Sequence, residues 1–158
     1  MKILAENKKA YYDYEILEKF EAGFVLTGSE VKSIKTGHIG LKGSYVVLKE
    51  KEVYLIGATI PPYQPKNASP DYDPERLRKL LLNKSEIKYL IGKTKERGLT
   101  LIPLKVYTKY AKIKLEFGIA KGKKKLDKRE LIKKRETDKI IERELKARGW
   151  QDSKEALI

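Results

Sequence analysis

Cysteine is absent from the 158-residue chain, and histidine occurs once, as His38. Without thiols the chain can form neither a disulfide nor a cysteine-ligated zinc site, and it has no cysteine nucleophile. A catalytic triad or a histidine-based metal site would have to use His38, which lies among glycines in a predicted loop. We therefore predict a protein that is not an enzyme and that binds neither a metal nor a cofactor.

Long hydrophobic runs are missing as well. The first ten residues contain only the short apolar run 3–5, and no stretch approaches the ~18 apolar residues of a membrane span. We therefore expect a cytoplasmic protein. Acidic residues mostly lie beside lysines in predicted helices or strands, which favours local charge balance over acid–base catalysis.

Positive charge, in contrast, is abundant and unevenly placed. The formal net charge is +14, and residues 121–150 hold 13 Lys and Arg against 6 Asp and Glu, which is 13 − 6 = +7. Nucleic acid is the expected partner, because neutralised phosphates release condensed counterions. A membrane surface would need a helix with a clean apolar face, whereas the large apolar residues of this segment show no regular spacing. A charge-rich composition that serves only solubility would not explain the uneven placement.

The first half of the chain predicts strands with one short helix. Hydrophobic residues alternate with polar ones over residues 11–26, which predicts strands with a bulge or sharp bend at Gly23. Ser29 as N-cap and Gly37 as C-cap bracket a predicted short helix. Two β-rich runs within residues 44–60 predict a hairpin whose loop lacks glycine.

A proline-rich segment, residues 61–74, is the clearest predicted loop. Asp73 and Pro74 at its end are a typical N-cap and first helical residue. The apolar spacing that follows predicts helix up to Gly98, as one helix or as two that break near residues 83–85.

The last predicted strand pair, residues 99–110 and 111–122, alternates apolar residues with lysines. Several strands of similar length, with helices in two connections and no βαβ rhythm, predict a mainly β fold with helices. We expect an OB-like closed β-barrel with flanking helices over residues 1–120. Residues 121–158 then form a basic C-terminal tail that is disordered until a polyanion binds it.

Tyrosines and lysines occur together in two parts of the chain. The tyrosines are Tyr11, Tyr12, Tyr14, Tyr107 and Tyr110, and the lysines are Lys8, Lys9, Lys105, Lys109, Lys112 and Lys114. On a sheet surface, rings can stack on unpaired bases while lysines neutralise the adjacent phosphates. The alternative for each ring is a place in the core.

Five strings occur in order along the chain: NKKAYYDY at 7–14, FEAGFVLTGSEVKSIKTG at 20–37, RLRKLLLNKSEI at 76–87, LIPLKVY at 101–107 and AKGKKKLDKRE at 120–130. With them the sequence closely resembles the SsrA-binding protein (SmpB) family, the partner of transfer-messenger RNA in bacterial ribosome rescue. The resemblance implies an OB-fold barrel that binds the elbow of the tRNA-like domain of that RNA, without catalysis. It also implies a tail that is helical in the mRNA channel of the ribosome.

The resemblance implies partners and RNA-facing positions. The partners are transfer-messenger RNA, the ribosome at its decoding centre and mRNA channel, and elongation factor Tu through the shared RNA; the protein would be a monomer. The RNA-binding residues would be Asn7, Lys8, Lys9, Glu21, Lys32, Arg76, Arg78, Lys79, Leu81, Lys112 and Lys114. Two alternatives stay open: another OB-fold protein that binds a different structured RNA, and an RNA-processing enzyme.

The tail matches the ribosome-binding string of the family. The implied residues are Lys121, Gly122, Lys123, Lys124, Lys125, Leu126, Asp127, Lys128 and Arg129. Leu126 departs from the pattern, because many members have a histidine or an aromatic ring there. Leucine can pack against a base but has no π system, so this sequence puts the stacking role of that position in doubt while it keeps the charge contacts.

Overall fold

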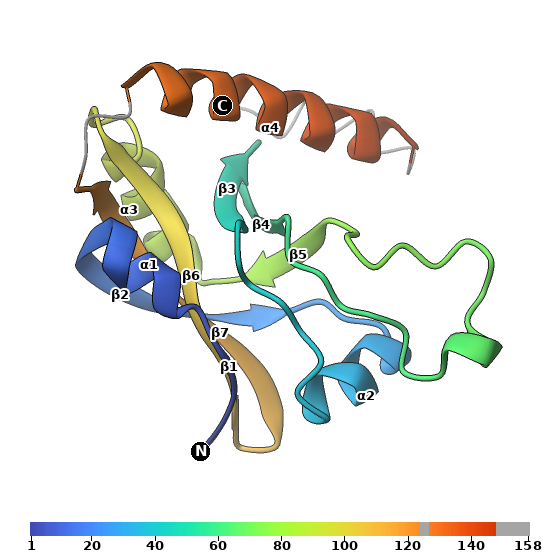
Figure 1. Cartoon of the computed structure of the whole chain (residues 1–158). Helices are drawn as coiled ribbons and strands as arrows, with labels where there is room; N and C mark the ends of the chain where they lie inside the picture. Colours follow the sequence, from blue (N-terminus) through green and yellow to red (C-terminus); the bar gives the residue numbers. More distant parts are fainter. Residues whose placement is uncertain (124–126, 148–158) are drawn as a thin grey trace.

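The computed structural model describes residues 1–123 and 127–147, with side chains described for 1–123 and 135–146. The elements, in chain order, are β1 (Lys2–Glu6), α1 (Lys8–Asp13), β2 (Tyr14–Phe24), α2 (Gly28–Lys35), β3 (Tyr45–Lys49), β4 (Glu52–Ile56), the 3₁₀ turn η1 (Pro65–Asn67), β5 (Arg78–Leu81), α3 (Lys84–Lys93), β6 (Leu99–Lys109), β7 (Lys112–Gly122) and α4 (Asp127–Ala147) (Figure 1).

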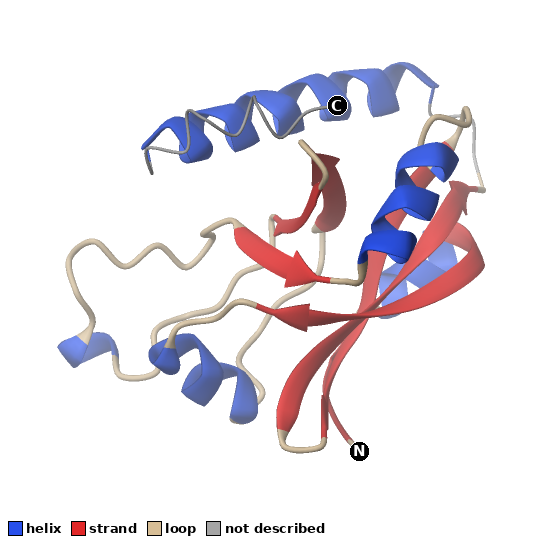
Figure 2. Cartoon of the chain, turned by 180° about the vertical axis from the view of Figure 1, so that it is seen from behind, coloured by secondary structure: helices blue, strands red, loops and turns tan. Residues whose placement is uncertain are grey.

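The strands form one antiparallel sheet that closes on itself. Its order is β1-β6-β3-β4-β5-β2-β7, and β6 also pairs with β7 along most of its length. Six strands therefore form a ring, to which β1 is added beside the C-terminal part of β6. The mainly β class with helices, predicted from the sequence, is confirmed (Figure 2).

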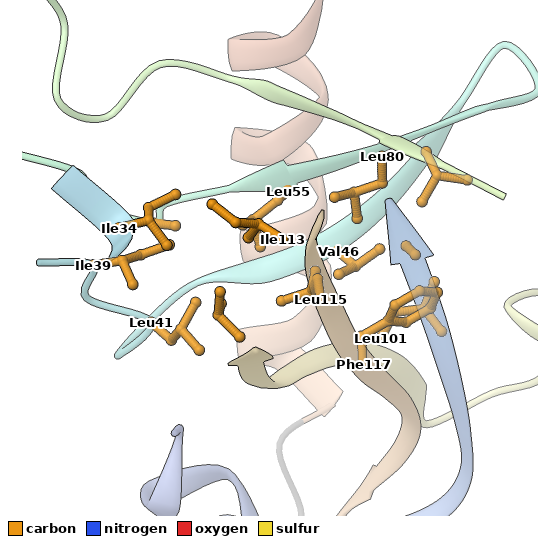
Figure 3. Packing of buried hydrophobic residues seen from close by; sticks show 14 of the residues in the cluster. Ile34, Ile39, Leu41, Val46, Leu55, Leu80, Leu101, Ile113, Leu115 and Phe117 are labelled. Carbon is orange, nitrogen blue, oxygen red and sulfur yellow. The ribbon is translucent and has the colours of Figure 1, made fainter. Parts of the chain in front are cut away.

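Alternating side chains of the strands fill the ring. Leu115 and Phe117 of β7 are buried against Leu55 of β4 and Leu101 of β6, and α2 adds Ile34 (Figure 3). Because successive strand residues point to opposite faces, the intervening residues of β7, such as Lys114 and Glu116, point outward. The predicted alternation is thus confirmed for residues 112–117 of β7, whereas residues 101–104 of β6 are all buried.

The N-terminal region differs from the prediction. Residues 11–13 belong to helix α1, and β2 begins at Tyr14. Gly23 keeps a regular register with its partners, while the register shift lies between Ile16 and Glu18. The two strands approach each other closely at this irregularity, because a Cβ on Gly118 of β7 would lie 2.8 Å from the carbonyl oxygen of Glu18. Only glycine fits there without a shift of the backbone.

Helix α2 is confirmed, but its N-cap is not Ser29. Thr27 caps the helix and forms a capping box with Glu30. The chain leaves the helix after Thr36 and turns at Gly37, whose φ of +85° favours glycine.

The predicted helix over residues 75–82 is wrong, because residues 78–81 form strand β5. This leucine-rich segment has high helix propensity, but it pairs with β4 on one side and β2 on the other and thereby closes the ring. Tertiary pairing overrides local preference here. The second part of the prediction is confirmed, since Asn83 caps helix α3, which ends at Lys93 with Thr94 as its C-cap, before Gly98.

Helix α4 lies against the outer face of β3 and β4 (Figures 1 and 2). Ile141 and Leu145 are buried there against Tyr54, Ile56 and Leu77. Four-residue spacing places these two on one helix face. Disorder of residues 121–158 in the free protein stays a prediction.

Candidate RNA interface

An exposed cluster of charged groups lies on the outer face of β2, β7 and β6, around Glu21. The Glu21 carboxylate accepts a hydrogen bond from the Tyr107 hydroxyl, and the Lys109 ammonium lies 3.4 Å from the same oxygen, Oε2. Three strands position these groups, because Glu21 pairs with Glu116 of β7, and β7 in turn pairs with β6.

The environment of Glu21 favours its charged form. The Tyr107 hydrogen bond and the nearby Lys109 and Lys114 lower the pKa of the Glu21 carboxyl, against a smaller opposing effect of burial. The pKa of Tyr107 is raised by burial and by the hydrogen bond to Glu21. At neutral pH the cluster therefore presents a fixed carboxylate that a phenol and ammonium groups surround.

Leu81 and Lys114 meet beside this carboxylate, above Gly23. Gly23 pairs with Leu81 of β5 on one side and with Lys114 of β7 on the other. A Cβ on Gly23 would lie 3.4 Å from the Leu81 Cβ and 3.8 Å from the Lys114 Nζ. The missing side chain leaves Leu81, 52% exposed, and Lys114 next to each other on the surface.

Glu116 continues the surface toward β1. Its carboxylate lies 3.1 Å from the Lys105 Nζ and 3.9 Å from the Lys19 Nζ. A shallow hollow of about 330 Å³ lies between these groups, Glu21 and Tyr107. We call the outward side chains of this region the Glu21 face: Lys19, Glu21, Leu81, Lys105, Tyr107, Lys109, Lys114 and Glu116.

A second charged cluster is buried in the fold. Arg78 is 0% exposed and donates to the Glu30 carboxylate and to the carbonyl oxygens of Ala58 and Pro74. Arg76 contacts the other Glu30 oxygen at 2.6 Å. We call Glu30, Arg76 and Arg78 the Glu30 cluster.

The prediction that Arg78 contacts RNA does not fit this arrangement, because its side chain is enclosed and its donors are used inside the fold. Arg76 is partly exposed but is also held by Glu30. Burial opposes the charged forms of Glu30 and Arg78, yet hydrogen bonds from Arg76, the Thr27 backbone and Arg78 keep the pKa of Glu30 below its usual value. The cluster joins α2 to the segment between β4 and β5, so its role is structural.

The other predicted residues are spread over the start of α1, over α2 and β5, and over the β6–β7 turn. The Asn7 side chain is buried and donates to the Pro103 carbonyl at 2.9 Å, so it holds the start of α1 against β6. Lys8 and Lys9 are exposed on α1, and Lys32 is exposed on α2. Lys79 is paired with Glu52 at 3.0 Å, and Lys112 is exposed at the β6–β7 turn. Only Glu21, Leu81 and Lys114 gather on the Glu21 face.

In the tail, Lys121 and Lys123 are exposed, and Gly122 ends β7. Lys124, Lys125 and Leu126 lie outside the described residues. The backbone of Asp127, Lys128 and Arg129 begins α4, and their side chains lie outside the described part.

The described residues, 1–123 and 127–147, bear on two further kinds of feature, a metal site and a membrane span. They contain no group of three or more metal-ligating side chains. None of the helices described has both the length and the apolar character needed to cross a bilayer.

Comparison with known proteins gives the family. The profile of the SmpB protein family matches residues 4–147. The chain belongs to the SmpB family. The SsrA-binding protein of Syntrophobacter fumaroxidans is 52% identical over 147 residues, which cover 93% of this chain and 91% of that protein. The SsrA-binding protein of Sulfurihydrogenibium sp. is 51% identical, with 93% and 96% covered.

A solved structure described as "tmRNA-SmpB: a journey to the center of the bacterial ribosome" is also similar. It superposes with a TM-score of 0.63 at 42% identity, over 81% of this chain and 93% of that chain. The family, the mainly β fold and the ring of strands thus agree with the expectations from the sequence.

Within this SmpB-family fold, the sequence did not predict which partners surround Glu21. The group of tyrosines and lysines pointed to Tyr107 and Lys109 but not to their contacts with Glu21, which is 86 and 88 positions away. The strand register could have indicated these contacts. Tyr107 pairs with Lys114, and Lys114 pairs with Gly23, which lies two residues from Glu21 on the same face of β2. The ring of Tyr107 is buried and is not available to stack on a base, so this residue contributes to the Glu21 face through its hydroxyl group.

Proposed function

We propose that this protein is an RNA-binding adaptor that binds the tRNA-like domain of transfer-messenger RNA and delivers it to stalled ribosomes for trans-translation. One observation carries the assignment to the Glu21 face: Glu21, Leu81 and Lys114, on three different strands, lie together on one exposed surface. The similar proteins named SsrA-binding protein, and the similar structure described with tmRNA, support the identity of the RNA.

The groups on the Glu21 face suit a folded RNA. The Glu21 carboxylate can accept from a ribose hydroxyl or a base amino group, and lysines on the same face can neutralise phosphates. Leu81 offers an apolar surface that can cover an unstacked base. The Tyr107 hydrogen bond holds the carboxylate in place before RNA arrives, which reduces the ordering cost of binding.

The tail has a separate role in this proposal. Residues 121–158 enter the decoding centre and the vacant mRNA channel, where the basic residues from Lys121 to Arg129 contact ribosomal RNA. Helix α4 must leave the body for this. Its described contact is small, with two buried aliphatic side chains, a hydrogen bond from the Leu77 amide to Glu144 at 3.1 Å and an ion pair between Lys49 and Glu142 at 3.3 Å.

Further partners follow from the same RNA. Elongation factor Tu joins the complex through the RNA that both proteins bind, and the protein acts as a cytoplasmic monomer without catalytic activity. Incubation of labelled RNA with and without magnesium tests the last point, and we expect the RNA to remain intact.

The test of the function separates the two regions. Full-length protein and a form that ends at Lys123 are titrated with the tRNA-like domain and are then assayed for tagging on stalled ribosomes. We expect RNA affinity to survive truncation while tagging is lost. Thermal unfolding shows whether the truncated body is still folded. If a folded truncated form did not bind RNA, the assignment of RNA binding to the Glu21 face would be wrong.

A further inference from the structure

Tyr110 occupies the tip of the β6–β7 hairpin with its ring in solvent. It is 88% exposed, more than any other large hydrophobic side chain in the described part of the chain. The turn lies at the opposite end of the ring from α4, close to the N-terminus (Figures 1 and 2). The Nζ of Lys109 lies 5.9 Å from the centroid of the Tyr110 ring.

The backbone of this turn does not favour tyrosine. Tyr110 and Ala111 have φ values of +52° and +62°, the left-handed conformation that asparagine and glycine adopt most readily in two-residue hairpin turns. The β3–β4 turn has the same conformation, with φ values of +52° and +63° at Glu50 and Lys51. The conformation alone therefore indicates no function, and what distinguishes Tyr110 is an exposed aromatic ring.

Lys109 connects that ring to the Glu21 face. The same ammonium group lies 3.4 Å from Glu21 Oε2, so the ring borders the surface that carries Glu21 and Lys114. Lys112 pairs with Lys109 across the hairpin and is exposed. The tip thus presents one aromatic ring among lysines, the combination that holds unpaired bases and their phosphates.

We propose that Tyr110 stacks on an unpaired base of the RNA that the Glu21 face binds, which extends the interface along the hairpin to its tip. This proposal rests on the proposed function. The stacked base lies outside the part of the RNA that contacts Glu21 and Leu81, and Lys112 neutralises a phosphate next to it.

Affinity of full-length variants for the tRNA-like domain tests the stacking. We expect Tyr110→Ala to weaken binding about 5- to 150-fold, the range found for loss of one base–aromatic stack. Tyr110→Phe should stay within about twofold of wild type, because phenylalanine keeps the ring. Tyr63→Ala is the matched control, since Tyr63 is also an exposed tyrosine in a loop, and it should leave affinity unchanged.

Tyr110→Asn separates a binding role from a structural one. Asparagine suits the left-handed turn, so the thermal midpoint should stay equal or rise while RNA affinity falls. A purely structural role for Tyr110 would predict equal or better RNA binding by this more stable variant.

The remaining outcomes are distinct. Wild-type affinity in Tyr110→Ala, with weakened binding in Glu21→Ala and Lys114→Ala, would overturn the stacking proposal and leave the proposed function intact. Wild-type affinity in all three would overturn the assignment of RNA binding to the Glu21 face and, with it, the stacking. Absence of binding by the wild-type protein would overturn the proposed function itself. Equal losses in Tyr110→Ala and Tyr110→Phe would replace stacking by a hydrogen bond from the hydroxyl.

Discussion

Two clusters in this molecule are built from similar groups and differ in burial. Glu30 and Arg78 lie inside the fold, with the partly exposed Arg76 at their edge, whereas Glu21 with Tyr107 and Lys109 lies at the surface. In the first, every charge is matched by a protein partner and the Arg78 side chain is inaccessible. In the second, the carboxylate is held in place but stays open to solvent. Burial thus separates charges that maintain the fold from charges available to a partner.

The comparison predicts opposite effects of mutation. Loss of a buried partner leaves an uncompensated charge in the fold and should destabilise the protein strongly. Loss of an exposed partner costs little stability, because water replaces it, and should weaken RNA binding instead.

The largest effect is expected for Arg78→Met. This change removes the Arg78 donor to the Ala58 carbonyl oxygen, one of two donors to the Pro74 carbonyl oxygen, and one partner of Glu30. We expect a loss of about 3–5 kcal/mol in the free energy of unfolding, measured by urea denaturation. Lys79→Met is the matched control, because Lys79 is adjacent in sequence and forms a partly exposed ion pair, and it should cost less than about 1 kcal/mol. Equal losses in the two variants would contradict the structural role of Arg78.

A smaller effect of the opposite kind is expected for Glu21→Ala. Loss of a charged hydrogen-bond acceptor at the interface should reduce RNA affinity by about 1.5–3 kcal/mol, or roughly 10- to 150-fold. The free energy of unfolding should change by less than about 1 kcal/mol. Glu15→Ala, at an exposed residue near the other end of β2, is the control and should bind RNA normally. Strong destabilisation by Glu21→Ala would place this residue with the Glu30 cluster.

Sequence alone could not separate the two clusters. Arg78 and Lys79 are neighbours in a string of basic and leucine residues, and both looked like RNA contacts. Only the pairing of β5 between β4 and β2 turns Arg78 inward and Lys79 outward. The missed strand and the unforeseen burial of Arg78 therefore have one cause, since local helix propensity does not reveal a ring that distant strands close.

Other parts were predictable because their signals are local. The alternation in residues 99–122 predicted β6 and β7, and the prolines predicted the loop that ends near Pro74. Glu21, Leu81 and Lys114 came from the family resemblance, and their meeting above Gly23 required the three-dimensional register.

The contact between helix α4 and the body is small, so its loss should destabilise the body only slightly. Leu145→Asp places a charge against Tyr54 and Ile56, and we expect it to detach the helix with a cost of about 2 kcal/mol or less to the body. Hydrogen exchange should show loss of amide protection in residues 127–147 and little change in β2, β6 and β7. Ile140→Asp, on an exposed position of the same helix, is the control. If wild-type α4 exchanges as fast as the Leu145→Asp variant, the free tail is disordered as the sequence predicted.

The smallest expected effect is the pH dependence of stability. The folded-state pKa of Glu30 is lowered, so its contribution is present above the unfolded pKa of about 4.3 and is lost as the pH falls through the lower folded value. Stability measured by urea denaturation should therefore decrease below about pH 4. Glu30→Gln should flatten this dependence more than Glu21→Gln does. If Glu21→Gln reduced the pH dependence of stability more than Glu30→Gln did, the exposed carboxylate would contribute more to stability than the buried one, which would contradict the comparison of the two clusters.

The most direct measurement is an NMR titration of the full chain with the tRNA-like domain, followed at backbone amides. We predict shifts at Glu21, Leu81 and Lys114 early in the titration, with the signals of Glu30 and Arg78 unchanged. Shifts around Arg76 and Arg78 and along α2, with none at Glu21, Leu81 and Lys114, would contradict the assignment of the Glu21 face as the RNA interface.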